Sequence, residues 1–416
     1  MTIDLPFQMD FIINLTFRCN LRCKMCTQYG ENFKEHAQEE LSIKDWLKFL
    51  DEIKEFNPKP KLILMGGEPF LYKDFETLFE TAYNLGIKTH IITNGYFLDK
   101  YIDILKDTDT DITISIDGLN KTHDGIRGLD GLFNKVVKNI ELIDKYQKLG
   151  SKMKFRINHV LLPENIDNII DFHKFFKKYN VCTFTFQHLQ SSNDELNNLS
   201  QCEWQKRLNQ NYCMGLIPKE NYKLDEKYAN NVKNSLNNFK SYCKHNNCFS
   251  FPALEDDEMN DYYTNNNLKN LRKGLVCATP WLNPSINPNG DVSNCIGNVI
   301  GNIKDNSFLE IWNNEKAQKL RTDLIKNGKF TICTKCCCFY KGNFIAAPNG
   351  LVEINSIKMQ LPSEINYIQS SKRIAFIKDE DTKQTSEYIP VIPINIHTDK
   401  MLNDINKNYT IVTIKE

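Results

Sequence analysis

The sequence predicts an α/β protein with a partial (β/α)6 barrel, a small cysteine-rich α+β domain and a β-rich tail. Three observations predict this fold. Short β-branched runs alternate with amphipathic segments from about residue 8 to residue 190, six cysteines fall between residues 277 and 338, and strand-like runs without cysteine follow. Strands and helices that alternate at this spacing imply right-handed crossovers and a parallel sheet, with functional residues at the carboxyl ends of its strands.

The candidate strands of the barrel are six runs rich in β-branched and aromatic residues. They are residues 11–15, 62–65, 89–93, 111–116, 154–162 and 182–189. Four segments between them repeat apolar residues every three to four positions, as amphipathic helices do. They are residues 43–56, 75–85, 132–146 and 166–179. Ser42 and Asp74 stand before two of these helices and are candidate N-caps.

The chain divides by composition into four parts. We expect the barrel at residues 1–190, a helical linker or lid at 191–275, a cysteine-rich auxiliary domain at 276–342 and a C-terminal extension of unknown role at 343–416. Strand-like runs in that extension fall at residues 373–377, 388–396 and 410–414. A chain of 416 residues suits two or three domains.

Charge and hydropathy exclude several classes of protein. The 52 basic side chains balance the 52 acidic ones, so a strongly basic nucleic-acid binder is not expected. The N-terminal residues lack the pattern of a secretory signal, and no stretch approaches the roughly 18 apolar residues of a membrane span. We therefore expect a soluble cytoplasmic protein. In that reducing compartment, clustered cysteines are metal ligands or catalysts more often than disulfides.

Three cysteines form a compact motif directly after the first strand. Cys19, Cys23 and Cys26 are spaced C-x3-C-x2-C on a loop. Three thiolates can hold three corners of a [4Fe–4S] cluster and leave its fourth iron open to a ligand. A structural zinc site is the alternative, but it usually takes four protein ligands in paired C-x2-C units. The motif by itself favours an iron–sulfur cluster.

A second motif ends the second strand, at the expected functional edge of the sheet. Gly66 and Gly67 are followed by Glu68 and Pro69. The two glycines allow a ligand to approach the backbone, the carboxylate of Glu68 can accept from an ammonium group, and Pro69 restricts the chain.

Together the two motifs resemble the radical S-adenosylmethionine (SAM) superfamily, whose signature is C-x3-C-x-(aromatic or apolar)-C followed by a GGEP strand end. Met25 occupies the variable position of that signature. Similar segments follow the third and fourth strands, at Thr93-Asn94-Gly95 and Ser115-Ile116-Asp117-Gly118, and a further one spans residues 123–128. The resemblance covers about residues 8–190.

The resemblance implies a cofactor set and the residues that hold it. Cys19, Cys23 and Cys26 would bind a [4Fe–4S] cluster, and the open iron of this cluster would chelate SAM. The amino group of SAM would contact the Gly66-Gly67-Glu68 segment. A one-electron reductant such as flavodoxin or ferredoxin would reduce the cluster. SAM would then be cleaved to a 5′-deoxyadenosyl radical, which removes hydrogen from an unactivated C–H bond.

Four more residues are candidates for SAM contacts on the same resemblance. Asn94 and Ser115 would contact the ribose or carboxylate, Arg127 the carboxylate, and Met25 the region of the adenine. Each has a structural alternative. Asn94 begins a common turn sequence, Ser115 can simply end its strand, and Arg127 can form a surface ion pair.

The second group of cysteines lies in the 276–342 segment. Cys277, Cys295, Cys333 and Cys336 are spaced so that a Gly-bearing hairpin and a helix at about residues 308–325 bring four thiols together. This stretch resembles the SPASM domain of radical SAM enzymes or its shorter variant, the twitch domain. Gly342 stands where SPASM domains carry a further cysteine, which favours the twitch form with one auxiliary [4Fe–4S] cluster.

Two alternatives stay open at this second site. Four cysteines in two pairs also suit tetrahedral zinc. Either Cys337 or Cys338 can replace Cys336 as the fourth ligand, although the spacing favours Cys336.

The other cysteines and two histidines have weaker signals. The cysteines are Cys182, Cys202, Cys213, Cys243 and Cys248, for which we expect core packing. Cys243 and Cys248 flank a short segment that can also bind metal. His159 and His188 lie on the fifth and sixth strands and are candidates for a substrate cavity, although a core histidine is the commoner case.

The leading functional hypothesis is a radical SAM enzyme acting on a small-molecule or peptide substrate. A peptide or protein maturase of the SPASM type is an alternative, although an early barrel start and no separate recognition domain weaken it. Ile296 stands where a sulfatase-maturing enzyme is expected to carry an acid, so that activity is disfavoured. A hypothesis of another class is a non-catalytic SAM-binding iron–sulfur protein for electron transfer.

Overall fold

The computed structural model describes most of the first 336 residues and short strands beyond them. The described ranges are residues 3–4, 8–27, 39–210, 222–243, 247–252, 254–266, 268, 271, 277, 279–336, 351–354, 357–360, 375–377 and 410–412.

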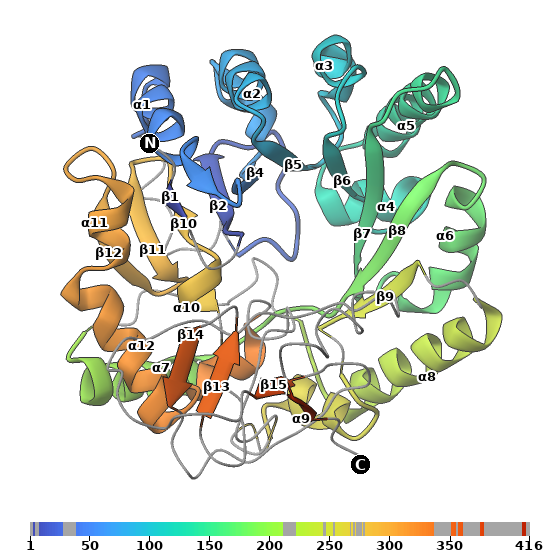
Figure 1. Ribbon diagram of the computed structural model, residues 1–416. Coiled ribbons are helices and arrows are strands. Elements are labelled where there is room, and N and C mark those ends of the chain that lie inside the picture. Colours follow the sequence, from blue (N-terminus) through green and yellow to red (C-terminus); the bar gives the residue numbers. More distant parts are fainter. Residues whose placement is uncertain are drawn as a thin grey trace.

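A ten-stranded sheet, in the order β12-β11-β10-β2-β4-β5-β6-β7-β8-β9, forms the centre of the molecule. Its six middle strands are parallel neighbours, as the barrel prediction requires. They are β2 (Asp10–Thr16), β4 (Lys61–Gly66), β5 (Lys88–Thr93), β6 (Asp111–Ser115), β7 (Lys154–Val160) and β8 (Val181–Gln187). Figure 1 shows these strands as an arc with α1, α2, α3, α5 and α6 along its outer side. The parallel α/β fold predicted from the sequence is confirmed.

Helices connect the parallel strands. They are α1 (Ile43–Ile53), α2 (Phe75–Asn84), α3 (Leu98–Leu105), α4 (Asn120–Arg127), α5 (Leu132–Lys148) and α6 (Ile169–Phe176), with 3-10 turns η2 (Pro69–Leu71) and η3 (Ile166–Asn168). Ser42 caps α1 through a capping box with Asp45, which confirms that prediction. Asp74 is the N-cap residue of α2, as predicted, but its side chain makes no cap hydrogen bond, because its backbone (φ −104°, ψ 27°) departs from the extended conformation usual for an N-cap.

The segment expected to be a helical linker is only partly helical. It contains α7 (Asp194–Leu208), α8 (Glu226–Tyr242) and α9 (Glu258–Thr264). Between α8 and α9, however, β9 (Cys248–Phe251) pairs in parallel with β8 and extends the central sheet. The sequence analysis did not predict β9, although Phe249 and Phe251 alternate with smaller residues in the manner of a strand.

The cysteine-rich segment joins the opposite edge of the sheet. Its strands are β10 (Ser285–Ile286), β11 (Asp291–Cys295) and β12 (Asn298–Asn302), and β10 lies parallel to β2. β10 and β11 form the expected hairpin, whose turn contains Gly290 at φ +96°. The segment also contains α10 (Thr279–Leu282), α11 (Phe308–Trp312), α12 (Glu315–Asn327) and the 3-10 turn η4 (Thr331–Lys335).

One helix was expected over residues 308–325, but the chain forms α11 and α12 instead. The break falls at Asn313 and Asn314. The side chain of Asn314 accepts a hydrogen bond from the Ala317 N–H and so starts a new helix.

The described part of the tail consists of two antiparallel strand pairs. They pair β13 (Leu351–Ile354) with β14 (Ile357–Gln360), and β15 (Ala375–Ile377) with β16 (Thr410–Val412). Two of the expected tail strands are thus present in shorter form, and the one expected at 388–396 lies outside the described residues. A further short pair joins β1 (Ile3–Asp4) to β3 (Phe56–Asn57).

Aromatic packing and a helix cap hold the cysteine-rich segment against the barrel. The Phe11 ring of β2 lies 4.7 Å from that of Phe308 and 5.3 Å from that of Phe49, measured between centroids. The carboxylate of Glu52 in α1 accepts from the N–H groups of Phe308 and Leu309, at the start of α11.

Among the described residues, no helix combines the length and apolar character needed to cross a membrane.

Candidate active site

The first three predicted ligands lie on the loop that follows β2. The thiols of Cys19, Cys23 and Cys26 are partly buried, and the Cys26 N–H donates to the Cys23 carbonyl at 3.2 Å. Burial raises the pKa of Cys19 to about 11, and the charges of Cys23 and Cys26 add to the effect. A thiolate here therefore requires a nearby cation, and a soft set of three sulfur ligands suits an iron–sulfur cluster.

The spacing of these sulfurs also favours a cluster over a single ion. Within the described residues, only His173, Cys243 and Cys248 bring three such ligand atoms within 4.8 Å of one another. Tetrahedral zinc would hold sulfurs about 3.8 Å apart, from Zn–S bonds of about 2.3 Å. A cubane binds each sulfur to a different iron, so its ligands lie farther apart than that. The cysteine loop fits the cluster that its sequence predicts.

The strand end at Gly66 and Gly67 lies directly against the backbone of the cysteine loop. The Gly67 N–H donates to the Thr16 carbonyl at 2.7 Å, and the Glu68 N–H donates to the Arg18 carbonyl at 2.9 Å. A Cβ at Gly66 would lie 2.3 Å from the Thr16 oxygen, and one at Gly67 would lie 2.3 Å from the Arg18 oxygen. The glycines thus permit contact between two segments of the chain, which adds to the ligand contact expected from the sequence.

Glu68 is fully buried and accepts three hydrogen bonds from the chain. Its donors are Thr93 Oγ1 at 2.7 Å, the Asn94 N–H at 2.9 Å and the Phe70 N–H at 3.4 Å. Burial raises the pKa of Glu68 to about 7, although these donors act in the opposite direction. The carboxylate joins the carboxyl ends of β4 and β5. Its predicted contact with SAM stays a prediction.

Asn94 joins two loops at the same edge of the sheet. Its side-chain N–H donates to Asn20 Oδ1 at 2.9 Å, and its Oδ1 accepts from the Tyr96 N–H at 2.9 Å. Gly95 has φ +81°, so the turn considered as an alternative for this sequence does form. Ser115 ends β6, paired with Asn158 of β7, at the edge where a ligand contact was predicted.

Arg127 forms a buried ion pair beside the cysteine loop. Its Nε lies 2.5 Å from Asp117 Oδ2, and its Nη1 lies 3.7 Å from Cys23 Sγ. Both partners of the ion pair are buried, so the surface pair considered for Arg127 is wrong. The guanidinium is placed to stabilise negative charge on the Cys23 sulfur.

Asp117 is the residue of this site whose role the sequence did not predict. Its Oδ1 accepts from the Val160 N–H at 2.7 Å, its carbonyl accepts from Asn165 Nδ2 at 2.9 Å, and its own N–H donates to His123 Nδ1 at 3.1 Å. These partners belong to α4, to the end of β7 and to the loop that follows β7. The signal in the sequence was the Ser115-Ile116-Asp117-Gly118 segment, which was matched to the family without a role for its acid.

The two histidines considered for a substrate cavity are core residues. His159 is buried, its ring lies 4.4 Å from that of Phe172, and its Nδ1 is 3.0 Å from the Ile116 carbonyl. His188 is buried with its Nδ1 2.6 Å from the Tyr263 hydroxyl. Burial lowers the pKa of His159 to about 4 and that of His188 to about 3. Both therefore stay neutral at ordinary pH.

Met25 contacts a small apolar cluster at the carboxyl ends of the last parallel strands. The buried members of that cluster are Ile126, Val160, Leu162 and Leu189. This places Met25 at the functional edge of the sheet, where the resemblance implies the adenine.

The four predicted auxiliary ligands lie in one region of the cysteine-rich segment. Burial raises the pKa of Cys333 well above its ordinary value, and the nearby charges of Cys295 and Cys277 raise it further. The Cys336 N–H donates to the Cys333 carbonyl at 3.0 Å within one turn. The folded chain thus gathers the thiols that the spacing predicted. Cys337 and Cys338 lie outside the described residues.

Two domain models match this chain. Residues 13–176 match the radical SAM superfamily, and residues 277–337 match the iron–sulfur cluster-binding domain called SPASM. The chain is a radical SAM protein with a SPASM domain. The family resemblance is thereby confirmed, as is the cofactor set it implies: a [4Fe–4S] cluster, SAM and auxiliary iron–sulfur binding. The number of auxiliary clusters and the individual ligands stay predictions.

Curated relatives of this radical SAM protein include two enzymes of Methanosarcina barkeri (strain Fusaro / DSM 804). The AdoMet-dependent heme synthase is 25% identical over 348 residues, which cover 82% of this chain and 93% of the relative. The Fe-coproporphyrin III synthase is 28% identical over 180 residues, which cover 42% of this chain and 43% of the relative. The chain therefore spans less than half of that second relative.

Two solved structures illustrate the shared fold. Streptococcus suis SuiB bound to precursor peptide SuiA has a TM-score of 0.54 and 18% identity, with 81% of this chain and 71% of that chain covered. The enzyme anSMEcpe with bound AdoMet and the Cp18Cys peptide has a TM-score of 0.52 and 19% identity, with 80% and 88% covered. At these identities the likeness shows the fold alone.

Proposed function

We propose that this radical SAM protein is an enzyme that removes a hydrogen atom from an unactivated C–H bond of its substrate. The observation that carries the proposal is the loop of Cys19, Cys23 and Cys26, seated against the Gly66-Gly67 strand end at the carboxyl edge of the sheet. With the cluster and SAM bound there, and an electron from a reductant such as flavodoxin or ferredoxin, the site supplies a 5′-deoxyadenosyl radical.

The residues of the chain hold and insulate this site. Cys19, Cys23 and Cys26 ligate the cluster, and Arg127 places a guanidinium 3.7 Å from the Cys23 sulfur. A buried cation at this distance stabilises thiolate over thiol and so favours ligation. Gly66, Gly67, Glu68, Asn94, Ser115 and Met25 stay the proposed residues around SAM, since they lie on the loops and strand ends at this edge.

We assign one auxiliary [4Fe–4S] cluster to Cys277, Cys295, Cys333 and Cys336. The Cys277 and Cys295 thiols lie close enough to raise the pKa of Cys333, and a turn joins Cys333 to Cys336; both observations support the assignment. Such a cluster can accept an electron from a substrate radical, bind substrate or relay electrons.

Anaerobic incubation with SAM and dithionite tests the radical chemistry. The reconstituted enzyme should release 5′-deoxyadenosine, and the Cys23→Ala variant should not. Equal, background amounts from both proteins would contradict the enzyme assignment and leave a non-catalytic electron-transfer protein as the better description.

Iron analysis tests the auxiliary cluster. The reconstituted protein should hold about eight iron atoms per chain in two four-iron clusters. Cys333→Ala should lose about half of this iron, because it removes one ligand of one cluster. The matched control is Cys202→Ala, whose thiol is exposed on α7 and should leave the iron unchanged. Full iron retention in Cys333→Ala would refute the assignment.

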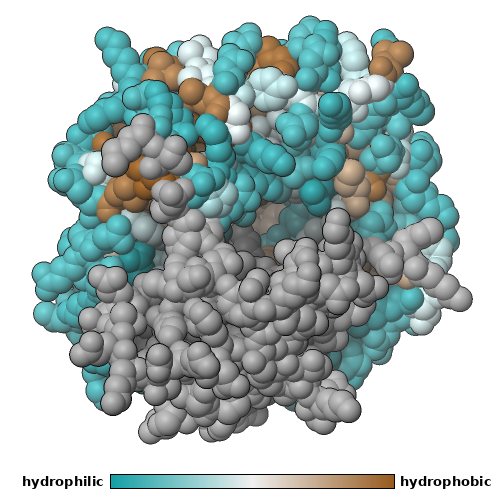
Figure 2. Space-filling view, viewed as in Figure 1, coloured by the Kyte–Doolittle hydropathy of each residue, from teal (hydrophilic) through white to brown (hydrophobic). Residues whose placement is uncertain are grey.

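We propose a peptide as the substrate. SuiB and anSMEcpe, which share this fold over about four fifths of the chain, were each solved with a peptide bound. Outside the grey residues, the face shown in Figure 2 is mostly hydrophilic. A small molecule is the second candidate, because the heme synthase matches over 93% of its length.

Deuterium transfer separates the two substrate classes. Short peptides encoded beside this gene, prepared with deuterated side chains, should pass deuterium to 5′-deoxyadenosine if the substrate is a peptide. The parallel arm uses deuterated iron porphyrins, the class of compound to which the names of both curated relatives refer. Transfer only in the parallel arm would overturn the peptide proposal while leaving the radical chemistry intact.

A further inference from the structure

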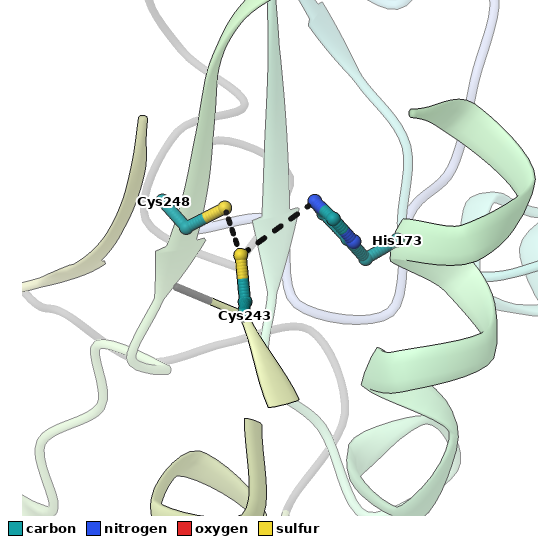
Figure 3. Close-up of side chains that lie close together, drawn as sticks. All are labelled: His173, Cys243 and Cys248. Carbon is teal, nitrogen blue, oxygen red and sulfur yellow. Dashed lines mark hydrogen bonds between the residues drawn. The ribbon is translucent and has the colours of Figure 1, made fainter. Parts of the chain in front are cut away.

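Three side chains that the radical site does not use converge at the edge of the sheet that carries β9. Figure 3 shows His173, Cys243 and Cys248 pointing toward one another. His173 belongs to α6, Cys243 is the C-cap of α8, and Cys248 is the first residue of β9. The fold thus brings together residues that are 70 positions apart in sequence.

The distances between these side chains suit one metal ion. Cys243 Sγ lies 3.3 Å from Cys248 Sγ and 3.9 Å from His173 Nε2, and all three atoms lie within 4.8 Å of one another. Bonds of about 2.3 Å to sulfur and 2.0 Å to nitrogen place tetrahedral zinc ligands about 3.5–3.8 Å apart. Small side-chain rotations would therefore centre an ion between them.

The surroundings of His173 have the arrangement found around metal-binding histidines. Its Nδ1 lies 3.4 Å from the Tyr242 hydroxyl, which can accept the ring N–H and fix Nε2 as the ligand. The rings of Phe184 and Phe239 lie 4.7 Å and 5.4 Å from the imidazole and hold it in place. His173 is buried, whereas Cys243 and Cys248 are partly buried, so water can reach a fourth position.

In the absence of an ion, the Cys248 thiol is held in its protonated form. Burial raises the pKa of Cys248 well above its ordinary value, and the adjacent Cys243 thiol adds to this effect. A divalent ion offsets the charge of two thiolates and makes their close approach favourable.

We propose that His173, Cys243 and Cys248 bind a divalent ion of the zinc class, separate from both iron–sulfur sites. The ion joins α6, the end of α8 and the start of β9, and so holds the outermost strand on the sheet. Because β9 pairs only with β8 in the described sheet, a link at its first residue opposes fraying of this edge. His245, which stands between the two cysteines, lies outside the described residues.

Metal analysis of the iron-loaded, full-length protein tests the site. We expect one zinc per chain in addition to the iron. Cys243→Ser, Cys248→Ser and His173→Gln should each lose the zinc and keep the iron, and should unfold at a lower temperature than the wild type. Cys182→Ser is the matched control, because Cys182 is a partly buried thiol on the neighbouring β8 and should keep its zinc.

X-ray absorption at the zinc edge of the wild type covers the case in which the variants fail to fold. We expect two sulfur ligands at about 2.3 Å, with nitrogen or oxygen ligands at about 2.0 Å completing the shell. A shell of four sulfurs would place zinc at the auxiliary cysteines and overturn the proposal. Absence of zinc, or a disulfide between Cys243 and Cys248 in protein purified without oxygen, would overturn it as well.

Discussion

A single carboxylate, that of Asp117, links α4 to the carboxyl end of β7 beside the cysteine loop. It pairs with Arg127 at 2.5 Å, and Arg127 in turn reaches the sulfur of Cys23. Both ionised groups are buried, so the energy of each depends on the other. A shift of the Asp117 carboxylate would therefore also move Arg127 and its contact with Cys23 on the cysteine loop.

We predict that Asp117→Asn lowers the free energy of unfolding by about 3–5 kcal/mol, because it leaves the Arg127 charge buried without its partner. Urea unfolding under anaerobic conditions measures this loss. Asp99→Asn is the control. Asp99 pairs with Lys135 at 2.7 Å on the surface, and its loss should cost about 0–1 kcal/mol. Similar losses in the two variants would contradict the proposed role of the buried pair.

Sequence patterns pointed to the proposed ligands of this site more readily than to the residues that support them. Cys19, Cys23 and Cys26 form a local motif, so their spacing alone predicts the cluster. The partners of Asp117, by contrast, include Val160 and Asn165, which are more than forty positions away. Such contacts depend on how strands align in the sheet, and no local pattern encodes that alignment.

The junction of β4 with the cysteine loop depends on backbone contact rather than on side chains. Carbonyl oxygens of Phe17 and Arg18 lie 2.6 Å and 2.3 Å from the place where a Gly67 Cβ would be. Distances this short leave no room for even a methyl group unless one of the two segments moves. The position of the cluster loop therefore depends on glycine at this strand end.

We predict that Gly67→Ala displaces the cysteine loop and lowers the iron bound at the radical site, with auxiliary iron retained. Iron analysis should show up to half of the iron lost, and 5′-deoxyadenosine formation should fall with it. Gly125→Ala is the control. Gly125 lies in α4 with no atom within 4 Å of its would-be Cβ, so alanine should add about 0.5–1 kcal/mol of stability. An iron content in Gly67→Ala equal to that of the wild type would contradict this prediction, because it would show that the cysteine loop accommodates the methyl group.

Helices were harder to predict than strands, for reasons visible in their residues. All six strands of the barrel were predicted, because runs of buried β-branched residues are a strong local signal. The helices α3 and α4 were not predicted. The helix α4 contains Gly125 and few apolar side chains, so it shows no sustained apolar repeat. The helix α3 does repeat apolar residues, at Leu98, Ile102 and Leu105, but only over eight residues.

One continuous sheet includes strands of the barrel and of the cysteine-rich segment, which the sequence did not suggest. The cysteine-rich segment was expected as a separate unit, yet β10 extends the barrel sheet at β2 and Glu52 caps α11. At the other edge β9 extends the same sheet beyond β8. Contacts that link residues 12 and 285 could not be read from composition, because they form only once the sheet exists.

The free energy of unfolding of the whole molecule depends on pH through three buried histidines. Burial lowers the pKa of His123 to about 3, of His159 to about 4 and of His188 to about 3. In the unfolded chain these groups take up protons at about pH 6.5. The unfolded state therefore binds more protons below that pH, and stability falls as pH drops, by up to about 1.4 kcal/mol per pH unit for each histidine.

We predict that the urea midpoint falls between about pH 7 and pH 5.5, and that His188→Phe shows a shallower fall. Tyr263→Phe is the control, since it removes the same 2.6 Å hydrogen bond but keeps the imidazole that titrates. It should therefore be less stable at every pH with the slope of the wild type. Iron measured at each pH confirms that the clusters stay bound. An unchanged slope in His188→Phe would mean that His188 takes up its proton in the folded protein.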